Sequence, residues 1–328
     1  MAGSGKAHLR DGDNVLRIED LVVEFKTAGG TVKAVSGISF DVQRGETLGI
    51  VGESGCGKST TGRAIMQLPK PTSGSIRFEG DELTTKSGSE VREARTKVQM
   101  IFQDPVSALN PRRTVRDSVL EPLAIWKRGT KEEQGKLVDE ILELVGIDPA
   151  RAAESRPHQF SGGQCQRISV ARALVLDPTL IICDEPVSAL DVSVQAQVLN
   201  LLEDLKERYG LTLVFIAHDL AVVKNISDRV AVMYLGKLCE VASSDDLYAK
   251  PAHPYTNLLV DSIPEPDPEA DHSLGDIIGE PPSPIDPPTG CRFHPRCPYA
   301  TDVCSAEEPQ LRELGAGHFV ACHNPVVA

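Results

Sequence analysis

A run of eight residues near the N-terminus has the composition of a phosphate-binding loop. Residues 52–59 read GESGCGKS and match the pattern G-x-x-x-x-G-K-[ST]. Glycines allow successive backbone N–H groups to point at phosphate oxygens, and a helix starting near Lys58 adds its positive end to the same anion. We expect Lys58 to contact the β- and γ-phosphates of a nucleotide and the Ser59 hydroxyl to bind Mg²⁺. A glycine-rich turn with an incidental lysine is the alternative, but it does not account for the full spacing.

An aromatic residue upstream completes the predicted nucleotide site. Phe25 follows an apolar run and is expected to stack on the adenine ring, although a role in the core is an equally open interpretation. The residues predicted to bind ATP are Phe25, Gly52, Glu53, Ser54, Gly55, Cys56, Gly57, Lys58, Ser59 and Thr60.

Two acids and a histidine lie where hydrolysis chemistry would need them. Asp184 and Glu185 follow an apolar run, and His218 follows another. Asp184 suits Mg²⁺, directly or through water, and Glu185 is placed to activate the attacking water as a general base. His218 can hydrogen-bond the γ-phosphate. Alternatively, the two acids could be structural caps and His218 an ordinary polar residue at a strand end. The presence of a phosphate-binding pattern in the same chain weighs against these alternatives.

The elements that must position these residues are short apolar strands. Residues 47–51, 180–183 and 213–217 are each followed by one of the polar motifs. Ligands of open α/β sheets lie at the carboxyl ends of the strands, so we expect the motifs to converge. The alternation of strands and helices predicts an α/β fold over residues 15–250, with an inserted helical subdomain at about 104–170.

Composition limits the classes of protein. The net charge of −13 argues against a nucleic-acid partner. The first residues lack the apolar core of a secretory signal, and no run of 18 apolar residues occurs. We therefore expect a cytoplasmic protein, with any membrane work done by other chains.

The two ends of the chain differ from the middle. Residues 1–14 are predicted to be a disordered tail. Residues 251–328 hold 14 of the 23 prolines, a density that regular helices and sheets do not tolerate. We expect a loop-rich extension that is held by something other than a large core.

Six motifs together resemble the ATP-binding-cassette (ABC) ATPases. They occur in the order of that family and span residues 15–240. The motifs are the loop at Gly52, Gln103 before Asp104-Pro105, Ser161-Gly162-Gly163-Gln164 preceded by Phe160, Asp184-Glu185, Ser188-Ala189-Leu190-Asp191, and His218. Phe160 is a mild departure, since leucine is more usual there.

The resemblance implies a fold and a two-chain mechanism. The fold is a P-loop NTPase (RecA-like) core with an inserted helical subdomain and an N-terminal antiparallel β part. Two cassettes pack head to tail, and each ATP lies between one chain's phosphate loop and the other's signature motif, here Ser161, Gly162, Gly163 and Gln164. Gln103 senses the γ-phosphate and Mg²⁺, so the Mg²⁺ set becomes Ser59, Gln103 and Asp184. Asp191 lies at the dimer seam, a place compatible with its simpler role of capping the next helix.

The sequence is similar in particular to the dipeptide and oligopeptide importers, and most to the second of their two ATPase subunits. The segments that carry this similarity are GESGCGKST at 52–60, FQDPVSALNPR at 102–112, DEPVSALDVSVQAQV at 184–198 and HPYT at 253–256. Such importers imply a partner ATPase subunit, two transmembrane permease subunits and an extracytoplasmic substrate-binding protein. We therefore expect a heterodimer at the cytoplasmic face of the membrane, attached peripherally.

Four of the eight cysteines lie near the C-terminus, in the spacing C-x5-C-x6-C-x17-C. Four thiolates suit either a [4Fe–4S] cluster or zinc, with nearby histidines in favour of zinc, and four free thiols are the simplest alternative. The importer family carries such a set, and the resemblance implies an iron–sulphur cluster bound by Cys291, Cys297, Cys304 and Cys322.

The motifs are also compatible with other functions, to different degrees. Importers of nickel complexes or sugars share these motifs, because an ATPase subunit does not touch the cargo. ABC ATPases of DNA repair or translation are disfavoured by the acidic charge and the single phosphate loop. A regulatory protein that binds nucleotide without hydrolysis is disfavoured by the presence of Gln103, Glu185 and His218.

Overall fold

The computed structural model describes residues 5–263 and 279–326 and divides the chain into two compact units. The first unit comprises Met1–Lys86 and Phe215–Ala328, and the second comprises Ser87–Val214. None of the helices within the described ranges combines the length and the apolar character that a bilayer span requires.

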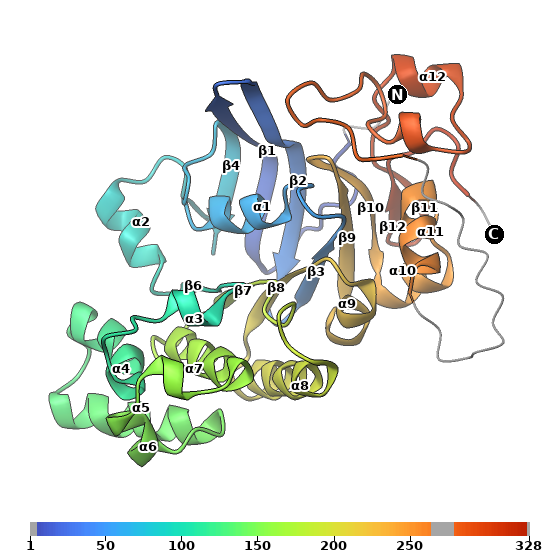
Figure 1. Cartoon of the computed structure of the whole chain (residues 1–328). Helices are drawn as coiled ribbons and strands as arrows, with labels where there is room; N and C mark the ends of the chain where they lie inside the picture. The colour runs from blue at the N-terminus through green and yellow to red at the C-terminus, as the bar shows by residue number, and fades with distance from the viewer. Residues whose placement is uncertain (1–4, 264–278, 327–328) are drawn as a thin grey trace, which may run out of the picture. The chain divides into compact units, whose positions relative to one another are not determined.

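The first unit is a mixed α/β structure (Figure 1). Its strands are β1 (Asn14–Thr27), β2 (Gly30–Gln43), β3 (Thr47–Val51), β4 (Ser73–Phe78), β5 (Asp81–Glu82), β9 (Arg229–Tyr234), β10 (Lys237–Ser243), β11 (Arg312–Gly315) and β12 (His318–Val320). Its helices are α1 (Lys58–Ile65), α9 (Leu220–Ile226), α10 (Ser244–Ala249), α11 (Pro254–Asp261), the 3₁₀ turn η2 (His294–Arg296) and α12 (Asp302–Ala306).

An antiparallel sheet with the order β2-β1-β4-β5 forms the N-terminal part of this unit. The long hairpin of β1 and β2 is in register at Val23 and Val35, both of which are buried. Apolar and polar residues alternate along much of β1, which gives the sheet one buried face. This is the antiparallel β part that the family resemblance implies.

The central strand β3 is buried along its whole length and pairs in parallel with β9. Continuous apolar runs are typical of parallel strands that are covered on both faces. The order continues from β9 through β10 and β12 to β11, with antiparallel pairing in these steps. The phosphate-binding pattern begins directly after Val51, at the carboxyl end of β3.

The C-terminal extension contributes regular structure as well as loops. Its hairpin of β11 and β12 adds to β10, where Glu240 lies opposite Val320. An aromatic cluster adds a small core, since Phe293 packs at 5.2 Å from Tyr234 and 5.4 Å from Tyr255 between ring centroids. The extension is thus tied down by a strand addition and an aromatic cluster.

The segment predicted as a disordered tail packs on the sheet from residue 5 onward, so that prediction is wrong for its described part. His8 is buried and its Nε2 lies 2.5 Å from the Ser39 carbonyl oxygen. Arg10 forms ion pairs with the buried carboxylates of Asp41, at 2.7 Å, and Glu46. A buried carboxylate requires a partner, and this requirement holds the segment in place.

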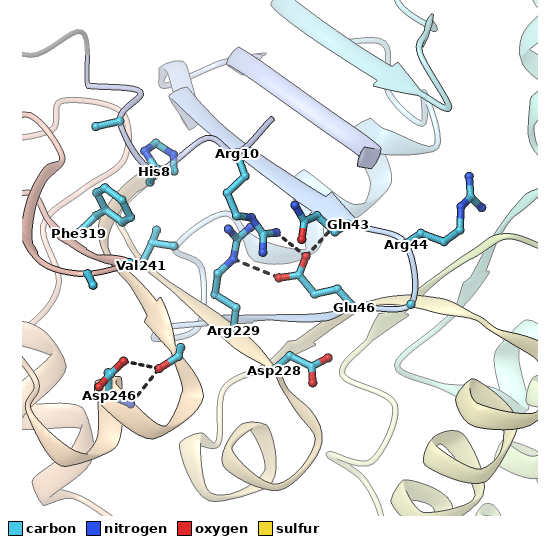
Figure 2. A pocket seen from close by; sticks show the side chains of 15 residues that line it. His8, Arg10, Gln43, Arg44, Glu46, Asp228, Arg229, Val241, Asp246 and Phe319 are labelled. Atoms are coloured by element: carbon cyan, nitrogen blue, oxygen red, sulfur yellow. Dashed lines mark hydrogen bonds and ion pairs between the residues drawn. The ribbon is translucent and has the colours of Figure 1, made fainter. Parts of the chain in front are cut away.

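The same segment forms one wall of a cavity of about 530 Å³ (Figure 2). Arg229 pairs there with Glu46 at 3.2 Å, beside Arg10. Glu46 precedes β3, so the cavity lies at the amino end of that strand. It is therefore separate from the phosphate-binding loop, which follows the carboxyl end.

The second unit is mainly helical. Its elements are α2 (Gly88–Ala94), β6 (Val98–Ile101), α3 (Pro105–Ala108), α4 (Val115–Trp126), α5 (Lys131–Leu144), α6 (Pro149–Glu154), the 3₁₀ turn η1 (Pro157–Gln159), α7 (Gly162–Leu174), β7 (Leu180–Asp184) and α8 (Val192–Tyr209). Strand β8 (Thr212–Ala217) begins in this unit and ends in the first. Helices α3 to α7 occupy residues 105–174, and β6 pairs in parallel with β7.

Helix starts in the second unit follow from local sequence. The side chains of Thr114, Thr130 and Asp148 each accept a hydrogen bond from a backbone N–H in the first turn of α4, α5 and α6, respectively. Such caps satisfy donors that have no partner within the helix. The succession of short, capped helices is therefore legible in the sequence.

Candidate functional site

The phosphate-binding loop connects β3 to α1 and depends on glycine at two positions. Gly52 has φ 155°, and a Cβ atom added to it would lie 2.0 Å from the Met233 carbonyl oxygen. Gly57 has φ 105°, and its added Cβ would lie 2.2 Å from the Ala34 carbonyl oxygen. No side chain fits at either place, so the glycines of the motif are required by close backbone approach.

Lys58 is held inside this loop. Its side chain is only 3% exposed, and Nζ donates hydrogen bonds to the carbonyl oxygens of Gly52, at 2.6 Å, and Glu53, at 2.9 Å. The positive charge is therefore fixed at the start of α1, where the helix N-terminus also favours an anion. Ser59 and Thr60 follow in the first turn of α1 and are half-buried.

The other loop residues divide between exposed and buried. Ser54 and Gly55 are exposed, whereas Cys56 is buried. Burial raises the pKa of the Cys56 thiol, which disfavours its reactive thiolate form.

Glu53 makes contacts that sequence reasoning missed. Its carboxylate forms a two-point ion pair with Arg296, with Nη1–Oε2 and Nη2–Oε1 distances of 2.9 and 3.0 Å. Its backbone N–H donates to the Tyr255 hydroxyl oxygen at 2.8 Å. Arg296 and Tyr255 both belong to the C-terminal extension, more than 200 residues away in sequence, and no local pattern marks them as partners of the loop.

Two further residues predicted for the nucleotide site lie in the first unit. Phe25 is on β1 and is 38% exposed, so it lies outside the core. This placement removes the alternative that Phe25 is a core aromatic. His218 follows β8 directly and is exposed, beside Asp219, which caps α9 by accepting from Ala221 N.

The acidic pair and the glutamine lie in the second unit. Asp184 ends β7 and is buried, and Glu185 follows it. The side-chain amide of Gln103 donates to Glu185 Oε2 at 2.9 Å, so the structure brings these two predicted catalytic residues together. Glu185 has φ 48°, a left-handed backbone that costs roughly 1–3 kcal/mol for a non-glycine residue and is common at functional sites.

The predicted signature motif forms the start of α7. Ser161 is the N-cap residue, and its hydroxyl accepts from Gln164 N at 3.3 Å while Gln164 Oε1 accepts from Ser161 N at 3.0 Å. This reciprocal cap leaves Gly162 and Gly163 at the first helical positions, where backbone N–H groups have no partner within the helix. The motif therefore presents donors at a helix N-terminus, as anion binding requires.

Asp191 caps the following helix. Its carboxylate accepts from the Ser193 hydroxyl at 2.7 Å and from Val194 N at 3.1 Å, at the start of α8. These hydrogen bonds, that of Ser193 foremost, lower the pKa of Asp191. Within the chain, Asp191 therefore acts as the N-cap of α8.

The four C-terminal cysteines lie within electrostatic reach of one another. The pKa of Cys322 is raised to about 11, chiefly by burial and further by the nearby thiols of Cys291, Cys297 and Cys304. Cys291 N also donates to the Cys304 carbonyl oxygen at 2.8 Å. The four thiols, which lie within the last 38 residues of the chain, are thus near enough to influence one another's charge.

The thiols do not form a ligand shell in this structure. Within residues 5–263 and 279–326, no group of three or more His, Cys, Asp or Glu side chains has an arrangement that would hold a metal ion. The predicted [4Fe–4S] site, and the zinc alternative with it, therefore lack support from the arrangement of the described residues.

Comparison with known families gives two matches within the chain. Residues 35–188 match the family model described as "ABC transporter". Residues 239–304 match the model described as "Oligopeptide/dipeptide transporter, C-terminal region". The second match includes part of the proline- and cysteine-rich extension.

Individual proteins and structures agree with these families. The oligopeptide transport ATP-binding protein AppF of Bacillus subtilis is 51% identical over 302 residues, which cover 91% of this chain and 92% of AppF. The dimeric structure of the ATP-binding cassette MJ0796 in a post-hydrolysis state, bound to ADP and Pi, is similar with a TM-score of 0.64 and 30% identity, covering 70% of this chain and 98% of that one. CbiO1 of Clostridium perfringens, part of the ABC transporter complex cbiONQ, gives a TM-score of 0.65 and 29% identity over 73% of this chain and 92% of that one.

These comparisons confirm the resemblance and the fold class that the sequence predicts: the chain belongs to the ATP-binding-cassette ATPases, in the group that carries the oligopeptide/dipeptide transporter C-terminal region.

Proposed function

We propose that this chain is the ATP-binding and ATP-hydrolysing subunit that energises a membrane importer of dipeptides or oligopeptides. One observation carries the proposal: the phosphate loop is already formed, with Lys58 buried and fixed between the carbonyl oxygens of Gly52 and Glu53. The relatives support the peptide cargo, since AppF is named an oligopeptide transport ATP-binding protein.

In this proposal the loop binds ATP, and Gln103, Glu185 and His218 supply the groups for hydrolysis. Backbone N–H groups of residues 52–59 and the Lys58 ammonium hold the phosphates, while Phe25 stacks on the adenine ring. Ser59, Asp184 and Gln103 would hold Mg²⁺, an ion that neutralises phosphate charge when it is bound.

Glu185 acts on the attacking water. Its carboxylate accepts the proton of the water, and its hydrogen bond with Gln103 orients it for that task. His218 donates a hydrogen bond to the γ-phosphate.

The signature motif acts on the ATP of a partner chain. Ser161 and the N–H groups of Gly162 and Gly163 would bind the γ-phosphate held by a second ABC ATPase subunit, and Asp191 would lie at the seam of the pair. The capped but donor-rich start of α7 supports this role. The dimeric cassette MJ0796, which was solved with ADP and Pi, shows that a relative assembles in pairs.

A membrane importer also requires other protein chains. We expect a heterodimer with a second ATPase subunit, at the cytoplasmic face of the cell membrane and attached peripherally to two transmembrane permease subunits. An extracytoplasmic substrate-binding protein would deliver the peptide. No nucleic-acid partner is expected, because the net charge is −13.

Reconstitution tests this proposal. The chain, its partner ATPase, the two permeases and the binding protein are assembled in liposomes, and uptake of a labelled tripeptide is followed with and without ATP. ATP-dependent peptide uptake supports the proposal. Uptake of a nickel complex or a sugar in place of the peptide would show that the importer carries that solute instead. A chain that binds no ATP would overturn the proposal altogether.

The four-cysteine loop has its own proposed role. We propose that Cys291, Cys297, Cys304 and Cys322 bind a [4Fe–4S] cluster that stabilises the extension. The donor set supports this, because four thiols gather in a loop-rich region where their mutual repulsion and burial disfavour the free thiolates. Zinc and free thiols are the other outcomes of the test described in the Discussion.

A further inference from the structure

The phosphate loop is held from outside by the C-terminal extension, and the contacts converge on Glu53. Arg296 is 5% exposed, and its guanidinium donates hydrogen bonds to both carboxylate oxygens of Glu53, at 2.9 and 3.0 Å. Tyr255, which is fully buried, accepts a hydrogen bond from the Glu53 backbone N–H. The side chain and the main chain of one loop residue are thus both fixed by the extension.

Fixing Glu53 also fixes Lys58. The Glu53 carbonyl oxygen accepts a hydrogen bond from Lys58 Nζ at 2.9 Å and another from Cys56 N at 3.3 Å. A chain of contacts therefore runs from Arg296 through Glu53 to the ammonium group that is placed to meet the phosphates. Two-point pairs between guanidinium and carboxylate are directional, so this contact sets an orientation as well as a distance.

The charges have a further consequence for an anionic ligand. Glu53 places a carboxylate inside a loop built to bind phosphate, where it would repel the nucleotide. Arg296 neutralises that carboxylate from a buried position, and such a pair is screened little by water. Without the guanidinium, an uncompensated negative charge would stand beside the phosphates.

Arg296 is itself held by its surroundings. It ends η2, one residue before Cys297, and its Nη1 also donates to the Tyr234 hydroxyl at 3.2 Å. Its guanidinium lies 5.9 Å from the ring centroid of Phe293, which is buried in the aromatic cluster. The backbone around it is closed by hydrogen bonds, since Arg296 N donates to Phe293 O at 2.9 Å and Cys297 N to His294 O at 3.3 Å.

We propose that Arg296 is a positioning residue for ATP binding: through its ion pair with Glu53 it holds the phosphate loop in its binding form and cancels a charge that would repel the nucleotide. The inference rests on the proposed function, because it needs the loop to bind ATP. It makes the C-terminal extension a control element of the nucleotide site, in addition to any structural role of its cysteines.

A double-mutant cycle that neutralises the two charges, on the purified full-length chain, tests this inference. ATP affinity is measured by fluorescence titration for the wild type, Arg296→Gln, Glu53→Gln and the double variant. We expect the Kd for ATP to rise at least about tenfold in Arg296→Gln, because the half-buried Glu53 carboxylate loses its partner. In the double variant the repelling carboxylate is gone but the two-point contact is still absent, so the Kd should lie between those of the wild type and Arg296→Gln.

Two more variants separate positioning from folding. Arg292→Gln is the matched control, because Arg292 lies in the same loop but donates to the Leu235 carbonyl oxygen instead of to Glu53, and its affinity for ATP should stay within about twofold of wild type. Arg296→Lys keeps the charge without the two-point geometry and should fall between wild type and Arg296→Gln. This variant also keeps the test decisive if Arg296→Gln does not fold.

The outcomes distinguish this inference from the proposed function. Equal affinity in wild type, Arg296→Lys and Arg296→Gln would overturn the inference alone. A loss in Arg296→Gln that Glu53→Gln does not relieve would also overturn it, because it would show a general packing defect. A wild-type chain that binds no ATP would instead remove the proposed function on which the inference rests.

Discussion

The Gln103 side-chain amide donates a hydrogen bond of 2.9 Å to the Glu185 carboxylate, within the second unit. The two residues lie 82 positions apart in sequence, on the loop after β6 and the turn after β7. Because β6 and β7 are parallel neighbours, their carboxyl ends lie at the same edge, and this brings the side chains together. A predicted sensor of the γ-phosphate is therefore linked to the predicted general base.

Glu185→Gln should nearly stop ATP turnover and leave ATP binding within a few-fold of wild type. The amide keeps the size of the side chain but cannot accept the proton of the attacking water, and general-base catalysis contributes roughly 10²- to 10⁴-fold. Steady-state phosphate release and nucleotide titration measure the two quantities. Glu154→Gln, at the exposed end of α6, is the control and should hydrolyse ATP at the wild-type rate. Normal turnover in Glu185→Gln would remove this residue from the catalytic role.

Lys58→Ala should weaken ATP binding on the order of 10- to 100-fold, because charge-assisted hydrogen bonds to phosphate are lost together with the bonds that organise the loop. Turnover should fall with it. Isothermal titration with ATP checks the affinity. Lys70→Ala, on the exposed segment after α1, serves as the control and should bind ATP normally. An unchanged affinity in Lys58→Ala would contradict the assignment of residues 52–59 as the phosphate site.

Gly57→Ala should destabilise the fold by more than Gly80→Ala and should also impair ATP binding. Both glycines have positive φ, 105° and 85°, so both substitutions carry backbone strain of about 1 kcal/mol or more. Only at Gly57 would the new methyl group collide with backbone, the Ala34 carbonyl oxygen at 2.2 Å, whereas nothing lies within 4 Å at Gly80. Urea unfolding measures the difference. Equal losses in the two variants would show that the close approach at Gly57 is not important.

Stability should fall as the pH is lowered from about 6.5 to about 4, in part because of His253. Burial lowers the pKa of His253 to about 4 from its ordinary value of 6.5. The unfolded chain therefore binds a proton in this range while the folded chain does not, so acid favours unfolding, by on the order of 3 kcal/mol across the range. The neutral ring is needed because its Nδ1 accepts from Tyr255 N at the start of α11.

His253→Asn tests this pH dependence. Asparagine can accept the same capping hydrogen bond but does not titrate, so the slope of unfolding free energy against pH should become shallower between pH 6.5 and 4. His158→Asn, at an exposed position of η1, should leave the slope as it is in the wild type. A slope that His253→Asn does not change would assign the acid sensitivity to other groups.

The cysteine loop can be tested by metal analysis of anaerobically purified protein. If the four cysteines bind a [4Fe–4S] cluster, the protein should contain iron and sulphide and absorb near ~400 nm, and Cys322→Ser should lose most of this signal. Cys165→Ser, in the second unit, should retain it. Zinc without iron would favour the alternative metal, and the absence of both would mean that the thiols remain free.

The amino-acid sequence by itself determined the features that depend on neighbouring residues. The glycine spacing of residues 52–59 specifies the phosphate loop, because Gly52, Gly55 and Gly57 all have a positive φ, which glycine adopts without strain. Ser161 and Gln164, three positions apart, specify the capped start of α7 in the same local way. The family and the fold class followed from such motifs and their order.

Tertiary structure alone decided the contacts between distant segments. Arg296 meets Glu53 across 243 positions, Arg10 meets Asp41 across 31, and neither pair has a period or a spacing that sequence reasoning can detect. The fold also sets the left-handed backbone of Glu185, which no residue preference predicts for a glutamate. The two ion pairs form because a buried charged group requires a partner of opposite charge. Which residue becomes that partner depends on the folded chain.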